Sequence, residues 1–150
     1  FVITDNGSVV GGGSGELLDI PSNLVDVIAI DAFISYALAL TADGQVIAWG
    51  SNSNGCLDIP SNLANVIAIS AGGGFALALT ADGQVIAWGD DDSDGETNVP
   101  TDLNDVIAIS AGGNHSLALK SNGEVVAWGA NYSSSINWMS KNERGLSVLL

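Results

Sequence analysis

The sequence predicts an all-β protein, a β-propeller whose four-stranded blades are about 40 residues long. The first observation is an internal repeat: VIAISAGGGFALALTADGQVIAWG at 66–89 returns with few changes at 27–50 and 106–129. The second is a period of 39 and then 40 residues between the tryptophans that end these copies, Trp49, Trp88 and Trp128. The third is the content of each copy, short β-branched runs between turn residues, with no 3.6-residue helical period.

Each copy contains three inner strands by this pattern. In the central copy a strand over 66–69 stops at a glycine triplet, which removes the steric cost of a sharp turn. A second strand over 75–80 ends at Asp82-Gly83, a strong hairpin signal, and a third follows over 84–88. Strands this short, separated by turns, are typical of a propeller blade.

A fourth, outermost strand is expected around 97–99. Pro100 follows it, and Pro21 and Pro60 keep nearly the same step in the other copies. Proline has no amide hydrogen to donate, so it suits the edge of a sheet.

The repeat divides one propeller domain into successive units. They are a partial first blade at 1–26, a second blade at 27–65, a third at 66–105, the inner three strands of a fourth at 106–129, and a tail or closing strand at 130–150. The first unit is the weakest, because Gly12 stands where the other copies carry tryptophan. The tail loses the repeat, and its run at 146–150 is the part that would form a closing strand.

Composition excludes some partners. The 150 residues include 3 basic and 17 acidic side chains, a net charge of −14, which repels phosphate backbones and anionic membranes. Hydrophobic residues make up 47% of the chain and charged residues 13%, so the chain is expected to fold. There is no apolar run of membrane-spanning length, and the single cysteine, Cys56, allows no internal disulfide and no thiolate metal cage.

The turn after the first strand differs most between copies. The second blade has Phe33-Ile34-Ser35-Tyr36 where the third has Gly72-Gly73-Gly74-Phe75 and the fourth has Gly112-Gly113-Asn114-His115. Bulky apolar residues in a turn indicate either local repacking or a contact surface. Aromatic residues on the loops of a rigid scaffold are typical interface anchors, which favours the contact surface.

An acidic loop follows the third blade's last inner strand. Asp90, Asp92, Asp94 and Gly95 match the first half of a calcium loop, but the twelfth position is Thr101 instead of a bidentate glutamate. Calcium binding is therefore one interpretation, and a solvated acidic turn is the other.

The sequence offers no catalytic set. The only histidine, His115, stands at the position of Tyr36 and Phe75, and the repeat supplies no serine or cysteine with an oriented base. We therefore expect a protein that is not an enzyme.

The copy at 106–129, VIAISAGGNHSLALKSNGEVVAWG, resembles the regulator-of-chromosome-condensation repeat, whose members form β-propellers. The stretch from Trp88 to Pro100 is similar to a short-repeat bacterial branch that includes a secreted propeller inhibitor of β-lactamases. That branch implies an extracellular setting and a partner held by the turns between the first two strands. The corresponding residues here are Phe33, Ile34, Ser35, Tyr36, Gly74, Phe75, Asn114 and His115.

Three full copies and most of a fourth do not complete a seven-bladed ring. Either two chains form one ring, or the chain is cut from a longer propeller, or a four-bladed ring closes through 146–150. The near-identity of the copies favours a homo-oligomer assembled through open edges.

Two functions follow from these patterns. The first is a non-catalytic binding module whose turn face holds a protein or a glycan. The second is a structural, self-assembling repeat segment, with calcium at Asp90, Asp92 and Asp94 as an ordering ion.

Overall fold

The computed structural model describes residues 1–5, 7–11, 19–22, 24–90 and 94–130. All regular secondary structure in these residues is β-strand, and the predicted all-β propeller class is confirmed. Within the same residues no helix long and apolar enough to cross a membrane is found.

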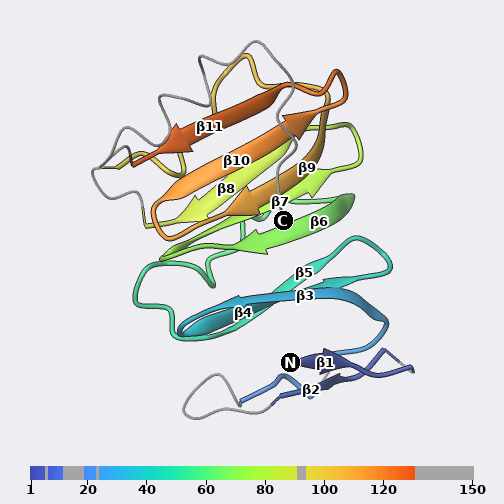
Figure 1. Ribbon diagram of the computed structural model, residues 1–150. Helices are drawn as coiled ribbons and strands as arrows, with labels where there is room; N and C mark the ends of the chain where they lie inside the picture. Colours follow the sequence, from blue (N-terminus) through green and yellow to red (C-terminus); the bar gives the residue numbers. More distant parts are fainter. Residues whose placement is uncertain (6, 12–18, 23, 91–93, 131–150) are drawn as a thin grey trace.

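Four antiparallel sheets follow one another along the described chain and stack face to face (Figure 1). The first is a hairpin of β1 (Val2–Ile3) and β2 (Val9–Val10). The second contains β3 (Val27–Phe33), β4 (Tyr36–Thr41) and β5 (Val46–Gly50). The third contains β6 (Val66–Ala71), β7 (Phe75–Thr80) and β8 (Val85–Gly89). The fourth contains β9 (Val106–Ala111), β10 (His115–Lys120) and β11 (Val125–Gly129).

The complete sheets have three strands each, with the second strand in the middle. The expected fourth strand at 97–99 is a loop, so the four-stranded prediction is wrong for the described third blade. Its amides bond locally: Asn98 donates to the carbonyl of Gly95 at 3.1 Å, and Val99 donates to that of Thr97 at 2.9 Å. Amides used in turns are not available for a ladder with a neighbouring strand.

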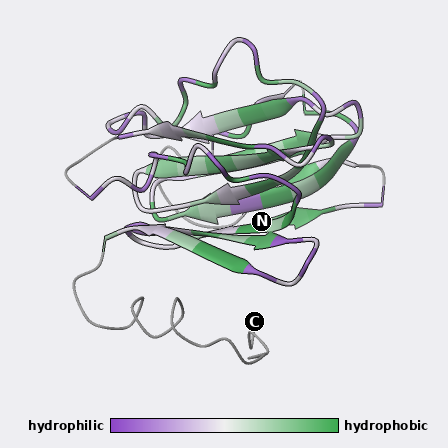
Figure 2. Ribbon diagram, turned by 90° about the horizontal axis from the view of Figure 1, so that it is seen from above, coloured by the Kyte–Doolittle hydropathy of each residue, from purple (hydrophilic) through white to green (hydrophobic). Residues whose placement is uncertain are grey.

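Large and small apolar residues alternate along each middle strand, and this alternation lets the blades stack. Leu77 on β7 belongs to one apolar cluster with Trp128 of the next blade. Ala76 and Ala78 on the same strand belong to a second cluster with Leu38 of the preceding blade. Figure 2 shows the apolar residues gathered on the strands and the polar ones along the connecting loops. Each blade thus presents one face with large and one with small middle-strand residues.

The repeat tryptophans fix the long loops between blades. The indole N–H of Trp88 donates to the carbonyl of Cys56 at 2.8 Å, and that of Trp128 donates to the carbonyl of Glu96 at 2.8 Å. Both tryptophans are buried, so these bonds satisfy the one polar atom of each side chain.

Backbone bonds also join successive blades at the hairpin end of the sheets. Val66 donates its amide to the carbonyl of Gly44 at 3.3 Å, and Val106 donates to that of Gly83 at 3.2 Å. These glycines have positive φ, which places the carbonyl of each hairpin within reach of the next blade.

A polar relay links the first strands of the three complete sheets. The Oδ2 atom of Asp31 accepts the amide of Ala71 at 2.8 Å, and the Oγ atom of Ser70 accepts the amide of Ala111 at 3.0 Å. Ser70 also donates to Asp31 at 3.3 Å. One side chain per blade therefore binds the backbone of the next blade, and Ser110 is the corresponding residue in the fourth.

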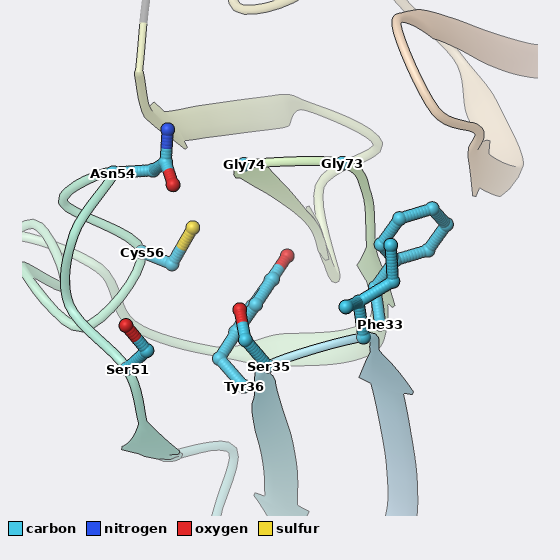
Figure 3. A pocket seen from close by; sticks show the side chains of 9 residues that line it. Phe33, Ser35, Tyr36, Ser51, Asn54, Cys56, Gly73 and Gly74 are labelled. Atoms are coloured by element: carbon cyan, nitrogen blue, oxygen red, sulfur yellow. The ribbon is translucent and has the colours of Figure 1, made fainter.

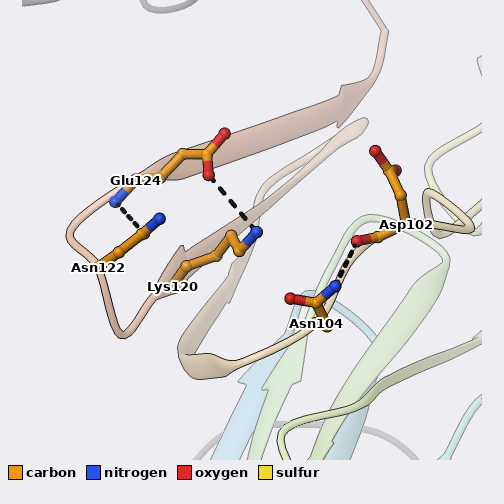
Figure 4. A network of polar contacts seen from close by, with 5 residues as sticks. All are labelled: Asp102, Asn104, Lys120, Asn122 and Glu124. Carbon is orange, nitrogen blue, oxygen red and sulfur yellow. Dashed lines mark hydrogen bonds and ion pairs between the residues drawn. The ribbon is translucent and has the colours of Figure 1, made fainter.

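The fourth blade closes its hairpin with polar side chains of its own (Figure 4). Lys120 forms an ion pair with Glu124 at 3.5 Å, and Asn122 accepts the amide of Glu124 at 3.0 Å. On the preceding loop, Asn104 donates to the carbonyl of Asp102 at 3.0 Å. The positive charge of Lys120 is thus paired within its own blade.

The described blades form an open series. The β1–β2 hairpin and the β9–β11 sheet lie at opposite ends of the stack (Figure 1). The predicted closing strand at 146–150 lies outside the described residues.

Candidate functional site

The turns of the second and third blades have equal length but different backbone conformations, with positive φ at Ile34 in the second and at Gly74 in the third. β3 extends through Phe33 and pairs it with Tyr36, so only Ile34 and Ser35 connect the two strands. The amide of Ser35 donates to the carbonyl of Phe33 across Ile34, the pattern of a γ-turn. In the third blade three glycines at 72–74 make the same connection, and the amide of Gly74 likewise donates to the carbonyl of Gly72 at 2.9 Å.

Ile34 adopts a backbone conformation that strains a β-branched residue. Its φ is +36°, and its side chain is 85% exposed. The other non-glycine residues with positive φ in the described chain are Asp26, Asn65 and Asp105, residue types that tolerate this region. An apolar residue that is both strained and exposed gains little from burial, and such residues are common at functional sites.

The glycine turns of the third and fourth blades stack backbone on backbone. Gly73 donates its amide to the carbonyl of Gly112 at 3.0 Å. A Cβ atom added to Gly73 would lie 2.2 Å from the carbonyl oxygen of Gly113, which leaves no room for a side chain. The turn of the second blade carries side chains, so it meets the third blade in a different way.

Tyr36 links the turn of the second blade to the turn of the third. Its hydroxyl accepts the amide of Gly72 at 3.0 Å and donates to the carbonyl of Phe75. Burial of the ring and hydroxyl raises the pKa of Tyr36 well above its ordinary range, so the hydroxyl keeps its proton at neutral pH. Tyr36 therefore holds the third blade's turn in place.

A pocket of about 180 Å³ lies between these two turns (Figure 3). Its lining consists of Phe33, Ile34, Ser35, Tyr36, Ser51, Asn54, Cys56, Gly73 and Gly74. Figure 3 shows Asn54, Cys56 and Ser51 on one side and Phe33 on the other, with Tyr36 between them. Sites for small-molecule ligands usually exceed roughly 300 Å³, so this pocket has the size for one side chain of a partner.

Cys56 is buried in this pocket and is not activated. Burial raises the pKa of its thiol, the Tyr36 hydroxyl acts in the opposite direction, and the charges of Asp90 and Asp58 raise it further. A thiol with a raised pKa carries little thiolate at neutral pH and is a poor nucleophile.

The structure brings together five of the eight predicted contact residues. Phe33, Ile34, Ser35, Tyr36 and Gly74 line the pocket. Among them Ile34 is the most exposed, while Tyr36 is only 2% exposed and forms the interior of the site.

The other three predicted residues lie elsewhere. Phe75 is fully buried between the third and fourth blades, so its side chain serves the core and offers no contact surface, which corrects the prediction at this position. Asn114 and His115 are exposed at the fourth blade's turn and do not line the pocket. Asn114 donates to the carboxylate of Asp94 at 3.1 Å.

The repeat pattern alone did not indicate Ser51, Asn54, Cys56 and Gly73, which complete the lining. The first three belong to the loop after β5, whose position is fixed by the bond from Trp88 to Cys56. The recurring tryptophan was visible in the sequence, but its acceptor 32 residues earlier was not.

The acidic loop borders this pocket. Asp90 accepts a hydrogen bond from the Nδ2 atom of Asn54 at 3.0 Å, so one of its carboxylates lies beside a lining residue. No group of three metal-ligating side chains converges within the described residues, and Asp92 of the predicted calcium set lies outside them. Calcium binding at Asp90, Asp92 and Asp94 stays a prediction.

Comparison with solved structures gives the same architecture. Human WBSCR16 is 23% identical with a TM-score of 0.61, covering 69% of this chain and 33% of that protein. Prp20p from Saccharomyces cerevisiae is 23% identical with a TM-score of 0.60, covering 75% of this chain and 36% of that protein. The CRINKLY ectodomain of the Arabidopsis thaliana receptor kinase ACR4 is 23% identical with a TM-score of 0.62, covering 79% and 47%. This chain thus spans between a third and a half of their lengths.

Sequence comparison identifies the repeat itself. No curated protein sequence matches the chain. The family model for the regulator of chromosome condensation (RCC1) repeat matches residues 35–56, 66–96 and 106–134, more than half of the chain. The matched segments contain the second-blade turn from Ser35 and the inner strands of the third and fourth blades. The chain belongs to the regulator of chromosome condensation repeat family.

Proposed function

We propose that this chain is a non-catalytic binding module that holds a protein partner at the second-blade turn. The observation that carries the proposal is Ile34, which is 85% exposed at a φ of +36° on the rim of the pocket. A strained apolar side chain in water is destabilising, so a contact that buries it would offset that cost.

The geometry supports a knob-and-hole contact. Ile34 projects outward, and the pocket beside it has the volume of one side chain. Interfaces obtain most of their affinity from a few anchors that fill well-packed pockets, and the rigid sheets beneath this turn keep both features in place.

Charge favours a basic partner. The chain carries a net charge of −14, and Asp90 lies beside the pocket through its bond to Asn54. A positively charged protein would associate faster with such a surface, and salt would slow that association. We therefore infer that lysine or arginine surrounds the partner's anchor residue.

The family supports protein binding in general terms. RCC1-like propellers are commonly used for protein binding, and one similar structure is yeast RCC1 (Prp20) bound to Kap60. The Prp20p structure is described together with that protein's binding to Gsp1p and histones. Kap60, Gsp1p and histones are partners of yeast Prp20. For this chain, the likeness to a β-lactamase inhibitor and an extracellular setting stay predictions.

Three properties of the site support a role without catalysis. The pocket is small, the hydroxyl of Tyr36 is committed to the third blade's backbone, and the thiol of Cys56 is protonated. Neither the Tyr36 hydroxyl nor the Cys56 thiol is free to act as a nucleophile or base at neutral pH.

The test compares two exposed isoleucines. Ile34→Asp removes the proposed anchor, and Ile107→Asp changes a residue that is 57% exposed in the fourth blade, away from the pocket. A candidate partner is a protein that the wild type and Ile107→Asp capture but Ile34→Asp does not. Each candidate partner is then purified, and its affinity is measured by titration calorimetry. We expect at least about tenfold weaker binding for Ile34→Asp.

A β-lactamase and a glycan array serve as defined probes in the same design. Inhibition of a purified β-lactamase by the wild type, reduced in Ile34→Asp, would identify an inhibitor. Glycan binding that the variant leaves unchanged, or a purified partner bound equally by all three proteins, would contradict the proposal.

Self-assembly is the second candidate function, and the near-identity of the copies at 27–50 and 66–89 favours it, because a blade of one copy can stack on a blade of another in the same way. Its calcium component is tested separately. Calorimetric heat on calcium addition, together with a lower Tm in chelator, would support an ordering ion, and no change in either would remove it.

A further inference from the structure

A polar groove lies at the hairpin end of the third blade. Its volume is about 600 Å³, within the roughly 300 to 1,000 Å³ that is typical of ligand sites. Its polar lining comes from Asn62 and Asn65 on the loop before β6, and from Thr80, Asp82 and Gln84 at the β7–β8 hairpin. Because β7 runs from the glycine turn to this hairpin, the groove lies at the opposite end of the blade from the pocket of the proposed function.

Hydrogen bonds hold the walls of the groove in place. Asn65 has a φ of +55°, a region that asparagine tolerates, and its carbonyl accepts the amide of Ala81 at 2.9 Å. This bond joins the loop before β6 to the hairpin. Thr80 is only 7% exposed, and its hydroxyl donates to the carboxylate of Asp82. The polar groups of the groove are therefore positioned before any ligand arrives.

In the second blade, a hydrogen bond within the chain uses the corresponding side chains. Gln45 stands at the repeat position of Gln84, and its Nε2 atom donates to the Oδ2 atom of Asp43 at 3.0 Å. The groove beside it is smaller, about 480 Å³. The amide of Gln45 is thus already engaged by its own hairpin.

In the fourth blade, an ion pair takes the same place (Figure 4). Lys120 and Glu124 stand at the repeat positions of Thr80 and Gln84, and they pair at 3.5 Å. The second and fourth blades therefore satisfy these polar side chains within the chain, each in its own way.

The third blade leaves its amide side chains available. Within the described residues, the side-chain amides of Asn62, Asn65 and Gln84 form no hydrogen bond, although all three line one groove. Their side chains are exposed, so water satisfies them until a ligand replaces it. A side-chain amide carries one carbonyl acceptor and one NH₂ donor, which is the complement of the N–H and C=O groups of a peptide backbone.

We propose that the third-blade groove binds an extended peptide segment that contains lysine or arginine. The three amides bind the backbone of the peptide, and the carboxylate of Asp82 binds its basic side chain. No basic side chain lines the groove, and the chain carries a net charge of −14, so a cationic peptide meets no repulsion there. The lining also contains no aromatic ring on which a sugar or a nucleobase could stack.

This inference does not rest on the proposed binding function, because the groove and the second-blade pocket share no lining residue. Ile34→Asp should therefore leave peptide binding in the groove unchanged. A variant of the groove should likewise leave binding at the second-blade turn unchanged, so failure of one proposal does not imply failure of the other.

The experiment measures fluorescence anisotropy of a labelled peptide of alternating lysine and glycine, titrated with the full chain. A second peptide carries a methyl group on each glycine nitrogen, so it keeps the charge and the length but lacks those amide donors. Gln84→Ala removes one amide from the groove. Gln45→Ala is the matched control, because this glutamine is also exposed in its hairpin but its amide is bonded to Asp43. Circular dichroism establishes that each variant is folded.

We expect the wild type to bind the unmethylated peptide at least about fivefold more tightly than the methylated one, because backbone hydrogen bonds contribute beyond charge. Gln84→Ala should weaken binding of the unmethylated peptide about fivefold, and Gln45→Ala should change it less than about twofold. Added salt should weaken the binding of both peptides.

Three results would overturn the proposal. Equal affinity for the two peptides, or no binding of either, would mean that the groove does not recognise a backbone. Equal losses in Gln84→Ala and Gln45→Ala would mean that the third-blade groove is not the site. Saturation-transfer signals from chitotetraose that disappear in Gln84→Ala, without peptide binding, would assign the groove to a sugar instead.

Discussion

The second and third blades are nearly the same sequence with different turns. Between 27–50 and 66–89, five of 24 positions differ, and all five lie at 31–36 and 70–75. The sheets have the same strand order and matching registers. The comparison therefore isolates what the turn contributes, because the scaffold beneath it is held nearly constant.

The glycine turn of the third blade and the side-chain-bearing turn of the second blade contact the next blade in different ways. Gly73 brings backbone directly against the fourth blade's turn. In the second blade, Tyr36 reaches across with its hydroxyl, Ile34 turns into solvent, and a pocket forms between the turns. The glycine turn is a structural joint, whereas the second-blade turn combines a joint with an exposed apolar anchor.

We expect the largest loss of stability from a substitution that disrupts the glycine joint between the third and fourth blades. Gly73→Ala places a Cβ atom 2.2 Å from the carbonyl oxygen of Gly113, so the two turns must separate. We expect the free energy of unfolding to fall by about 2 to 3 kcal/mol in a denaturant titration. Gly113→Ala is the control, because a Cβ atom there meets nothing within 4 Å. Equal losses in both variants would contradict the stacking of the two turns.

We expect a smaller loss of stability from a substitution that removes the Tyr36 hydroxyl from the junction between the second and third blades. Tyr36→Phe removes the hydroxyl that accepts the Gly72 amide at 3.0 Å and donates to the carbonyl of Phe75. The Gly72 amide and the Phe75 carbonyl still bond each other at 2.8 Å, so the variant loses the net contribution of the hydroxyl's bonds, and we expect the free energy of unfolding to fall by about 1 kcal/mol. His115→Ala, at the equivalent but exposed position, should change it much less. A neutral Tyr36→Phe would mean that the hydroxyl does not hold the third blade.

The pH dependence of stability also tests whether the Tyr36 hydroxyl is buried between the second and third blades. Burial raises the pKa of Tyr36 above its ordinary value of 10.0, so above that pH the unfolded chain loses a proton that the native protein keeps. The native state then binds more protons, and stability falls as pH rises, by roughly 1 kcal/mol per pH unit. Unfolding titrations between neutral and strongly alkaline pH measure this slope. Tyr36→Phe should flatten it, and an unchanged slope would assign it to other groups, such as Cys56, whose pKa is also raised.

The sequence predicted the fold well because the repeat supplies many independent signals in phase. Strand positions followed from β-branched runs and from turns such as Asp82-Gly83. The prediction of an outer strand at 97–99 is wrong, because the amides of this segment are hydrogen-bonded within local turns. A weak extended pattern in the sequence does not reveal those bonds.

The site was predicted only in part, for a physical reason. A residue that departs from the repeat is visible in sequence, which is how Phe33, Ile34, Ser35 and Tyr36 were found. Whether the next blade covers such a position is not visible in sequence, so the pattern predicts a contact residue at Phe75, which the fourth blade buries. The remaining wall of the pocket comes from the loop after β5, which folding brings beside the turn.

The central claim is that the second-blade turn keeps a strained, exposed side chain at the expense of stability. The most direct measurement is the free energy of unfolding of Ile34→Gly. Because glycine adopts the φ of +36° without strain, we expect stability to rise by about 1 kcal/mol. Ile67→Gly, a control that is 55% exposed and does not have positive φ, should instead lose roughly 0.5 to 1 kcal/mol. An equal loss in both variants would contradict the claim, because Ile34 would then carry no strain to release.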